Sequence, residues 1–407
     1  MTSNAQDIRT LNSRIDAMRE DMVSSMSKMV SIKAISPLSG GTGEAKRADF
    51  LEQKLNSFGV KVKRYDYKDE SGAIRSNLIA ILGSKDRTLW IVAHMDTVAE
   101  GDIALWVHDP FKAHVGGGKI FGRGTNDNGE ALIGAMFAIK ALADSGIDPK
   151  YNYGLVLVAD EELGSKFGIQ KLIKEGLFNK TDMFLVPDSN TKSGRDIEIA
   201  EKSILWLKIT VNGKQVHAST PEKGVNAQRY SSLLMVDLDE LLHKKYNARS
   251  DMFDPGASTF EMTKHEKNVD SINIVPGKDV FYMDSRILPM YKTKDIIKDI
   301  KKLVSSPKYK QVKVKLEPIQ QEDAPPPTDK NAEVFVAISD SIRKQLNVEP
   351  KAVGIGGGTC AAYFRREGWP AVVWGIGEDV AHQPNEFAYI NDIVKCAKVF
   401  AAMFIQE

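Results

Sequence analysis

Acidic and histidine side chains directly follow two apolar stretches of this chain. His94 and Asp96 come after residues 89–92, and the acidic run 160–162 comes after residues 155–158. Both stretches have the near-continuous apolar composition of strands buried on both faces. Because open α/β sheets bind ligands at the carboxyl ends of their strands, we expect these side chains to lie on one rim. Histidine and carboxylate ligands together indicate a zinc or cobalt site of a hydrolase.

Three further segments carry side chains that could join this site. Asp127 follows a glycine-rich turn before an apolar helix, Asp188 ends an apolar run, and His382 lies in a polar loop. Each has a plain structural alternative, since Asp is a favoured helix N-cap and acidic runs often form solvated turns. His94 and Asp96 share a face of an extended segment, so the carboxylate could orient the imidazole ring. Together the candidates support each other more than any one does alone.

Bulk composition excludes several classes of protein. The 407 residues suit two domains, and the formal net charge of +1 gives no electrostatic case for nucleic acid or an anionic membrane. Only two cysteines occur, Cys360 and Cys396, so a secreted disulfide scaffold is not indicated and a cysteine-based zinc site is excluded. No stretch approaches the roughly 18 apolar residues of a membrane span, and the N-terminal segment lacks the apolar core of a signal peptide. We therefore expect a cytoplasmic protein.

The elements that would position these residues follow from hydrophobic periodicity. Strand patterns at 89–92 and 155–158 enclose a helical pattern at 130–142, an alternation typical of a mainly parallel α/β sheet. Residues 204–318 change to a pattern of four antiparallel strands and two helices, long enough for a domain of their own. We predict an α/β catalytic domain of residues 1–203 and 319–407, with this α+β domain inserted into it.

Five short motifs in a fixed order resemble one enzyme family. They are HMD at 94–96, GRGTNDNG at 122–129, DEE at 160–162, PD at 187–188 and AHQPNE at 381–386. The set is similar to the di-zinc amidohydrolase family of acetylornithine deacetylase, succinyl-diaminopimelate desuccinylase, aminoacylase, glutamate carboxypeptidase and carnosine-type dipeptidases. The resemblance spans nearly the whole chain. It implies that the inserted domain is a lid through which two subunits form a homodimer.

The resemblance also implies which residues hold two zinc ions per subunit, with Co²⁺ or Mn²⁺ able to replace them. Five residues would be the metal ligands: His94, Asp127, Glu162, Asp188 and His382. Asp127 would bridge the two ions. His94 and Asp188 would complete one site, and the remaining pair would complete the other.

Further roles are implied for residues that do not bind metal. Glu161 would act as general base and then as general acid, while Asp96 would orient His94. In the inserted domain, His217 would reach the partner subunit's active site and stabilise the oxyanion there. Four residues would contact the substrate, namely Asn273, Arg286, Gly357 and Thr359. Arginine suits a substrate carboxylate because its planar fork pairs with two oxygens.

Two departures from the deacylase pattern bear on the substrate. Asp188 stands where deacetylases and desuccinylases usually carry Glu, and residues 357–361 lack the usual serine and aspartate. Aspartate at the first position is commoner among dipeptidases and aminopeptidases. We expect metal-dependent cleavage of an amide bond in a small substrate with a free carboxylate, by a deacylase of the desuccinylase or acetylornithine deacetylase type. A dipeptidase or carboxypeptidase is the alternative, and a metal-free small-molecule binding relative is a remote one that Glu161 opposes.

Overall fold

The computed structural model describes residues 3–405, which divide into two compact units. The first unit comprises the chain up to Ile199, Thr328–Ala352 and the residues from Thr359 onward. The second comprises Ala200–Pro327 and Val353–Gly358. The sequence-based boundaries of the inserted domain, 204–318, remain a prediction and differ in detail from the limits of the second unit.

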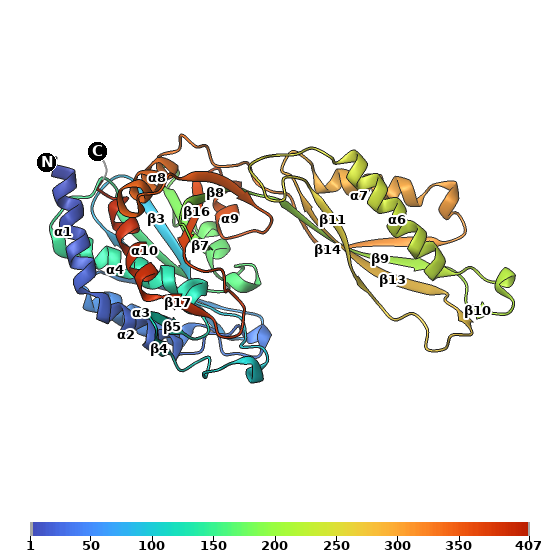
Figure 1. The fold of residues 1–407 in the computed structure, drawn as a ribbon, viewed down its shortest axis with the longest axis horizontal. Helices are drawn as coiled ribbons and strands as arrows, with labels where there is room; N and C mark the ends of the chain where they lie inside the picture. The colour runs from blue at the N-terminus through green and yellow to red at the C-terminus, as the bar shows by residue number, and fades with distance from the viewer. Residues whose placement is uncertain (1–2, 406–407) are drawn as a thin grey trace. The chain divides into compact units, whose positions relative to one another are not determined.

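An eight-stranded sheet with the order β1-β2-β6-β3-β7-β16-β8-β15 forms the centre of the first unit (Figure 1). Its strands are β1 (Val62–Lys68), β2 (Ile74–Leu82), β3 (Thr88–His94), β6 (Asn152–Val158), β7 (Met183–Thr191), β8 (Asp196–Glu201), β15 (Lys351–Ile355) and β16 (Ala371–Ile376). The central strands β6, β3, β7 and β16 run parallel, and β2 and β8 pair antiparallel on either side of them. Every residue of β3 and β6 is buried, as their apolar sequences predict.

Helices cover both faces of this sheet. They are α1 (Ser3–Ala17), α2 (Arg19–Val30), α3 (Ala45–Ser57), α4 (Glu130–Ser145), α5 (Ile169–Lys174), α8 (Glu333–Leu346), α9 (Ala361–Arg366) and α10 (Ile390–Ala402). Helices α4 and α10 pack against each other and against the sheet, and α1 and α2 pack on them. On the other face, Trp90 and Val92 of β3 belong to an apolar cluster with residues of α5 and α9. The sheet is therefore a buried middle layer, which is why its strands read as unbroken apolar runs.

A small three-stranded sheet lies beside the segments that carry two of the sequence motifs. It has the order β17-β5-β4, built from β17 (Phe387–Tyr389), β5 (Lys119–Phe121) and β4 (His114–Gly116). Strand β5 directly precedes the glycine-rich turn, and β17 directly follows the AHQPNE segment. Pairing of Phe387 with Phe121 therefore brings these two distant motifs together.

The second unit is a four-stranded antiparallel sheet with two helices (Figure 1). Its strands, in sheet order, are β11 (Thr259–His265), β13 (Lys278–Ile287), β9 (Ser203–Asn212) and β14 (Lys313–Glu322), and its helices are α6 (Ala227–Lys245) and α7 (Thr293–Val304). Leu205, Leu207 and Ile209 alternate along β9 and pack with buried residues of both helices. A short pair of strands, β10 (Val216–His217) and β12 (Ile274–Val275), extends from this unit.

These two architectures confirm the predicted fold class, a mainly parallel α/β sheet and an α+β domain of four strands and two helices. The N-terminal helical segment divides at Met18 into α1 and α2. Among the described residues, no helix combines the length and apolar content that crossing a membrane requires.

Candidate metal centre

The candidate centre forms where parallel strands end at one edge of the large sheet. His94 is the last residue of β3, and Glu161 and Glu162 come just after β6, its parallel neighbour. Asp188 lies in β7 beyond the residues that pair with β3. Because parallel strands end on the same side, their sequence-distant carboxylates and imidazole converge.

Asp127 contacts both histidines of the centre, one with each carboxylate oxygen. Its Oδ1 lies 2.8 Å from Nε2 of His94, and its Oδ2 lies 3.1 Å from Nε2 of His382. The Nε2 of His94 is also 3.6 Å from Oδ1 of Asp188. The Nε2 of His382 is 3.0 Å from Oε2 of Glu162. Two groups of three potential ligands result, and Asp127 is the member that they share.

The donor set fits two divalent metal ions. Within each group, all ligand atoms lie within 4.8 Å of one another, and each group combines one imidazole nitrogen with two carboxylates. This is a donor set that zinc and neighbouring first-row metals use in hydrolases. The structure therefore brings together the five residues that the sequence nominated as ligands, and their role as ligands remains a proposal.

The surrounding carboxylates favour the protonated forms of both imidazoles when no cation is bound. Hydrogen bonds to Asp127 and Glu162 raise the pKa of His382 to about 10. Burial works to lower the pKa of His94, but its hydrogen bond to Asp127 and nearby negative charge raise it well above the ordinary value. Metal ligation requires the neutral imidazole, so a bound ion would displace these protons.

Asp96 fixes the turn that carries the two glutamates. Its Oδ1 accepts a hydrogen bond from the main-chain N–H of Glu161 at 3.1 Å, and its Oδ2 accepts one from that of Glu162 at 3.3 Å. The Nδ1 of His94 lies 3.0 Å from the main-chain oxygen of Asp96 and 3.5 Å from its Oδ1. The imidazole is therefore oriented mainly by the backbone of Asp96, whereas the carboxylate positions the glutamates.

Glu161 lies beside the two ligand groups without belonging to either. Burial raises the pKa of its carboxyl group well above the ordinary value, and the negative charge of Asp188 adds to this effect. His94 acts in the opposite direction. An upward shift of the pKa is the direction that suits a carboxyl group acting as general base and then general acid.

A buried carboxylate outside the predicted set holds the turn that carries Asp127. Glu386 is 0% exposed, and its Oε1 accepts hydrogen bonds from the main-chain N–H groups of Asn126 at 2.9 Å and Asp127 at 3.1 Å. Its Oε2 accepts from Gly124 N–H at 3.0 Å and pairs with Nη1 of Arg123 at 2.7 Å. One carboxylate thus accepts from three main-chain N–H groups of the turn and pairs with one guanidinium.

Gly124 is required by the backbone of this turn. Its φ is 82°, and a Cβ atom there would lie 2.6 Å from Cγ2 of Thr97. Gly124 therefore approaches Thr97 closely and donates its N–H to Glu386.

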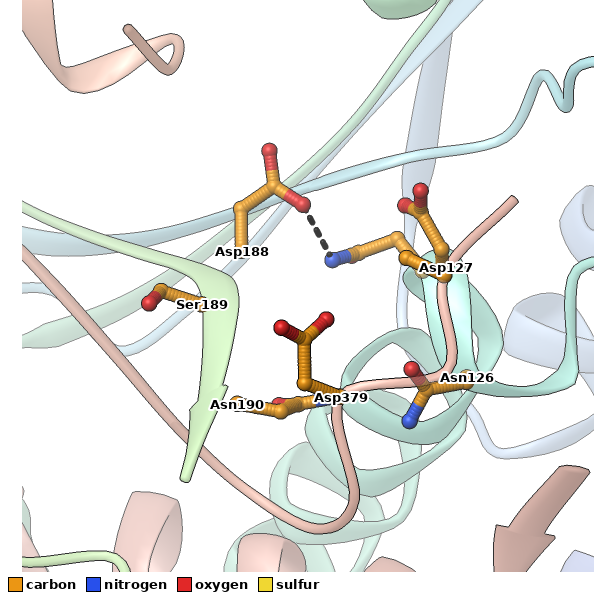
Figure 2. Close-up of a pocket in the computed structure, with 8 residues that line it drawn as sticks. Asn126, Asp127, Asp188, Ser189, Asn190 and Asp379 are labelled. Carbon is orange, nitrogen blue, oxygen red and sulfur yellow. Dashed lines mark hydrogen bonds between the residues drawn. The ribbon is translucent and has the colours of Figure 1, made fainter. Parts of the chain in front are cut away.

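Asn128 links the Asp127 turn to Asp188. Its Nδ2 donates to the main-chain oxygen of Pro187 at 2.7 Å and to Oδ1 of Asp188 at 3.0 Å, the bond dashed in Figure 2. Sequence reasoning assigned no role to Asn128 or Glu386. The available signal was their place inside the GRGTNDNG and AHQPNE motifs.

Most of the predicted substrate-contact residues lie in the second unit. His217 is exposed, with its Nδ1 2.7 Å from Oγ of Ser219, and the main-chain oxygen of Asn273 accepts from Ala218 N–H at 2.8 Å. Arg286 pairs through Nε and Nη2 with the two carboxylate oxygens of Asp284, at 3.0 and 3.2 Å. The roles predicted for His217, Asn273 and Arg286 remain predictions.

The remaining two predicted contacts belong to the glycine-rich segment. Gly357 lies in the second unit, with open space where a Cβ atom would be. Thr359 belongs to the first unit, and its Oγ1 accepts a hydrogen bond from the N–H of Ala361 at 3.2 Å. Their substrate-binding roles also stay predictions.

Comparison with known proteins agrees with this geometry. The sequence profile of peptidase family M20/M25/M40 matches residues 90–406. An uncharacterized metallohydrolase of Methanocaldococcus jannaschii is 37% identical over 401 residues, covering 94% of this chain and 98% of that protein. Succinyl-diaminopimelate desuccinylase of Rickettsia bellii is 26% identical over 384 residues, covering 92% and 94%. The crystal structure of aminopeptidase PepT from Bacillus cereus shares the fold, with a TM-score of 0.73, 21% identity and coverage of 95% and 98%. The chain therefore belongs to peptidase family M20/M25/M40 and is a metal-dependent hydrolase.

Proposed function

We propose that this protein uses two zinc ions to hydrolyse an amide bond in a small substrate with a free carboxylate. The observation that carries the proposal is Asp127, whose two oxygens belong to two candidate ligand groups beside the half-buried Glu161. Co²⁺ or Mn²⁺ would serve in place of zinc, since the ligands are imidazoles and carboxylates.

The chemistry follows from the roles that these side chains can take. Ions bound by His94, Asp127, Glu162, Asp188 and His382 would supply Lewis acidity for the amide carbonyl and lower the pKa of a water molecule. Glu161 would accept the proton of the attacking water, which its raised pKa favours. It would then deliver that proton to the departing amine nitrogen. Asp96 would keep Glu161 in place through its bond to the main-chain N–H.

A deacylase of the desuccinylase or acetylornithine deacetylase type is the leading assignment. The match to a desuccinylase over nearly both complete chains supports it. A dipeptidase or carboxypeptidase is the alternative, supported by Asp188 in place of glutamate and by the fold shared with an aminopeptidase. A metal-free binding protein is disfavoured because a binder needs neither Glu161 nor a shared bridging carboxylate.

Substrate contacts are proposed for Asn273, Arg286, Gly357 and Thr359. Arg286 has five N–H donors, and its bonds to Asp284 and to the main-chain oxygen of Gly356 use three of them. Two donors therefore remain for a substrate carboxylate.

Assembly and location are part of the same proposal. We expect a homodimer through the inserted domain, in which His217 stabilises the oxyanion in the partner's active site. The exposure of His217 is compatible with such a role. We expect a cytoplasmic enzyme that binds no nucleic acid and no membrane, since the formal net charge is only +1.

A substrate panel tests this function directly. Protein purified without chelator and supplied with zinc or cobalt should hydrolyse members of a set of N-acetyl and N-succinyl amino acids and dipeptides. Each substrate should react at least about tenfold faster than its C-terminal amide, because the amide offers no negative charge to the two remaining N–H donors of Arg286. Equal rates for acid and amide would remove Arg286 from the site. Less than about one zinc per subunit, not restored by added metal, would favour the metal-free alternative.

A further inference from the structure

The first turn of helix α3 contributes two charged side chains that are almost fully buried. Glu44 immediately precedes the helix and Arg47 is its third residue, and they are 0% and 2% exposed. Burying a charge is costly unless the protein supplies partners, so the contacts of these side chains show which parts of the fold they hold together. Neither residue belongs to the five sequence motifs.

Glu44 connects this turn to the acidic motif at 160–162. Its two carboxylate oxygens accept from Nε and Nη2 of the buried Arg75, at 2.8 and 3.1 Å. The Nη1 of Arg75 in turn pairs with Oδ1 of Asp160 at 3.0 Å. The guanidinium of Arg75 is therefore shared between two carboxylates and anchors the start of the acidic motif.

Arg47 joins three segments that are far apart in the sequence. Its Nη1 donates to the main-chain oxygen of Met95, the middle residue of the HMD motif, at 2.7 Å. Its Nε and Nη2 donate to the main-chain oxygen of Ile32, at 3.1 and 2.8 Å. A Cβ atom at Gly124 would lie 3.5 Å from Nη1, so the guanidinium also borders the turn that carries Asp127.

The guanidinium of Arg47 carries a positive charge that it does not share in a close ion pair. Within residues 3–405, all of its hydrogen bonds go to main-chain oxygens. Burial lowers the pKa of Arg47 to about 10, and the negative charges of Asp96, Glu386 and Glu44 act against this effect. The side chain is therefore a cation at neutral pH, and Asp96 is the carboxylate on which its charge acts most.

Asp96 differs from the other two carboxylates because, in the described part of the chain, it has no guanidinium partner. The other two pair with Arg75 and Arg123. Asp96 has one ion-pair contact, to Nδ1 of His94 at 3.5 Å. An imidazole that binds metal is neutral, so this contact supplies no positive charge once the centre is loaded. The unshared charge of Arg47 then remains to balance the carboxylate of Asp96.

We propose that Arg47 is a positioning residue of the metal centre, which fixes the HMD turn through Met95 and balances the charge of Asp96. Asp96 in turn accepts from the main-chain N–H groups of Glu161 and Glu162. The inference rests on the proposed metal-dependent hydrolysis and adds to it a residue outside the ligand and substrate contacts. The alternative is that Arg47 only stabilises the packing of α3.

Cobalt binding tests the proposal without turnover, because the visible spectrum of protein-bound Co²⁺ reports the geometry of its ligands. Arg47→Gln removes the charge, so it should change this spectrum and weaken Co²⁺ affinity by about 10–100-fold, the usual effect of losing a residue that orients ligands. Arg47→Lys keeps the charge but loses the planar fork, and its Co²⁺ affinity should stay within about threefold of wild type. Competition with a chromophoric chelator measures these affinities.

Arg365→Gln is the matched control for a purely structural effect. Arg365 is also buried, at 4% exposure, and its Nε donates to the main-chain oxygen of Ala371 at 3.0 Å. Both glutamine variants should lower the free energy of unfolding of the metal-free protein, measured in urea. Only Arg47→Gln should change the cobalt spectrum and affinity. A folded Arg47→Gln that keeps both at wild-type values would overturn the proposal.

A double-mutant cycle tests whether Arg47 acts through Asp96. In the Asp96→Asn background, Arg47→Gln should lower Co²⁺ affinity by less than about threefold, because no carboxylate remains to be balanced. An equal loss in both backgrounds would overturn the proposal. If Arg47→Gln alone does not fold, the double variant should still fold and bind cobalt as Asp96→Asn does. Failure of the double variant to fold would also overturn the proposal.

Kinetics separates failure of this proposal from failure of the proposed function. In the cobalt-loaded enzyme, Arg47→Gln should lower kcat by about 10–100-fold and leave KM within about twofold of wild type, since it removes no substrate contact. A raised KM with unchanged kcat would refute the positioning role. If the wild type cleaves none of the substrates in the panel, the hydrolytic assignment fails, and the cobalt spectrum and affinity still decide the role of Arg47.

Discussion

Glu386→Gln should weaken metal binding from a position that touches no metal ligand side chain. The wild-type carboxylate accepts hydrogen bonds from the N–H groups of Gly124, Asn126 and Asp127, and it pairs with Arg123 at full burial. Glutamine keeps the shape but loses the charge, and its NH₂ group faces donors. Breaking one side of a buried ion pair typically costs about 3–5 kcal/mol. Because the turn carries the shared ligand Asp127, zinc affinity should fall by about 10–100-fold, the usual range for residues that orient ligands.

The assay separates the two effects. Urea unfolding of chelator-treated protein measures the stability of the metal-free fold, and competition with a chromophoric chelator measures zinc affinity. The free energy of unfolding of Glu386→Gln should be lower than that of the wild type by a few kcal/mol, a large share of the roughly 5–15 kcal/mol that stabilises a typical domain. Glu378→Gln, on an exposed ion pair shortly before the same segment, should change neither quantity appreciably.

Two outcomes would refute the reasoning about Glu386. If Glu386→Gln kept wild-type zinc affinity while it lost stability, the carboxylate would be structural only and would not position Asp127. If both stayed at wild-type values, the carboxylate would not carry the charge that its pairing with Arg123 requires. Burial does raise the pKa of Glu386, whereas the backbone donors and Arg123 lower it, so this second outcome is a real test.

Further predictions concern the catalytic groups. Glu161→Gln should keep its metal, measured by elemental analysis, but lose about 10²–10⁴-fold in kcat, and a variant that retained more than about a tenth of wild-type kcat would exclude the general-base role. Glu162→Ala should instead lose metal from one site, and full occupancy would contradict its assignment as a ligand. Mixing His217→Ala with Glu161→Gln subunits should regenerate activity in heterodimers, whereas no recovery after proven subunit exchange would refute action in trans. The pKa of His382 in the metal-free centre is raised to about 10, so metal binding must displace its proton. Zinc affinity should therefore increase from pH 6 to pH 8, by up to about tenfold per pH unit for each proton released. An affinity independent of pH would show that no proton is displaced.

The sequence predicted the convergence of the ligands because strand ends obey a simple rule. His94 and Glu162 follow apolar strands of a parallel sheet, and parallel strands place their ends on one edge. The alternation of apolar and polar residues along β9 likewise predicted a sheet with one buried face in the second unit. Local patterns therefore carried the fold class and the candidate segments, and the resemblance to the enzyme family nominated the five ligands among them.

What the sequence could not supply are the contacts between distant polar groups. Glu386 and Arg123 are 263 positions apart, and no local pattern reveals that their side chains meet. Arg286 looked like a free guanidinium, but Asp284 faces the same side of the strand two residues away and pairs with it. The His94–Asp96 spacing suggested a carboxylate contact, whereas the closer contact is to the main-chain oxygen.

The run of three acids after β6 shows how the fold gives different contacts to adjacent carboxylates that the sequence alone cannot tell apart. Asp160, with a φ of 64°, turns its carboxylate to the buried Arg75 at 3.0 Å. Glu162 accepts from the N–H of Val98 at 3.1 Å and contacts His382, which fixes its carboxylate within one candidate ligand group. Among the described residues, the carboxylate of Glu161 has no hydrogen-bond partner, so it alone is free to take and return a proton. One acid is anchored, one contacts a candidate ligand histidine and one is left without a partner, which is the division of roles that the proposed metal-assisted amide hydrolysis requires.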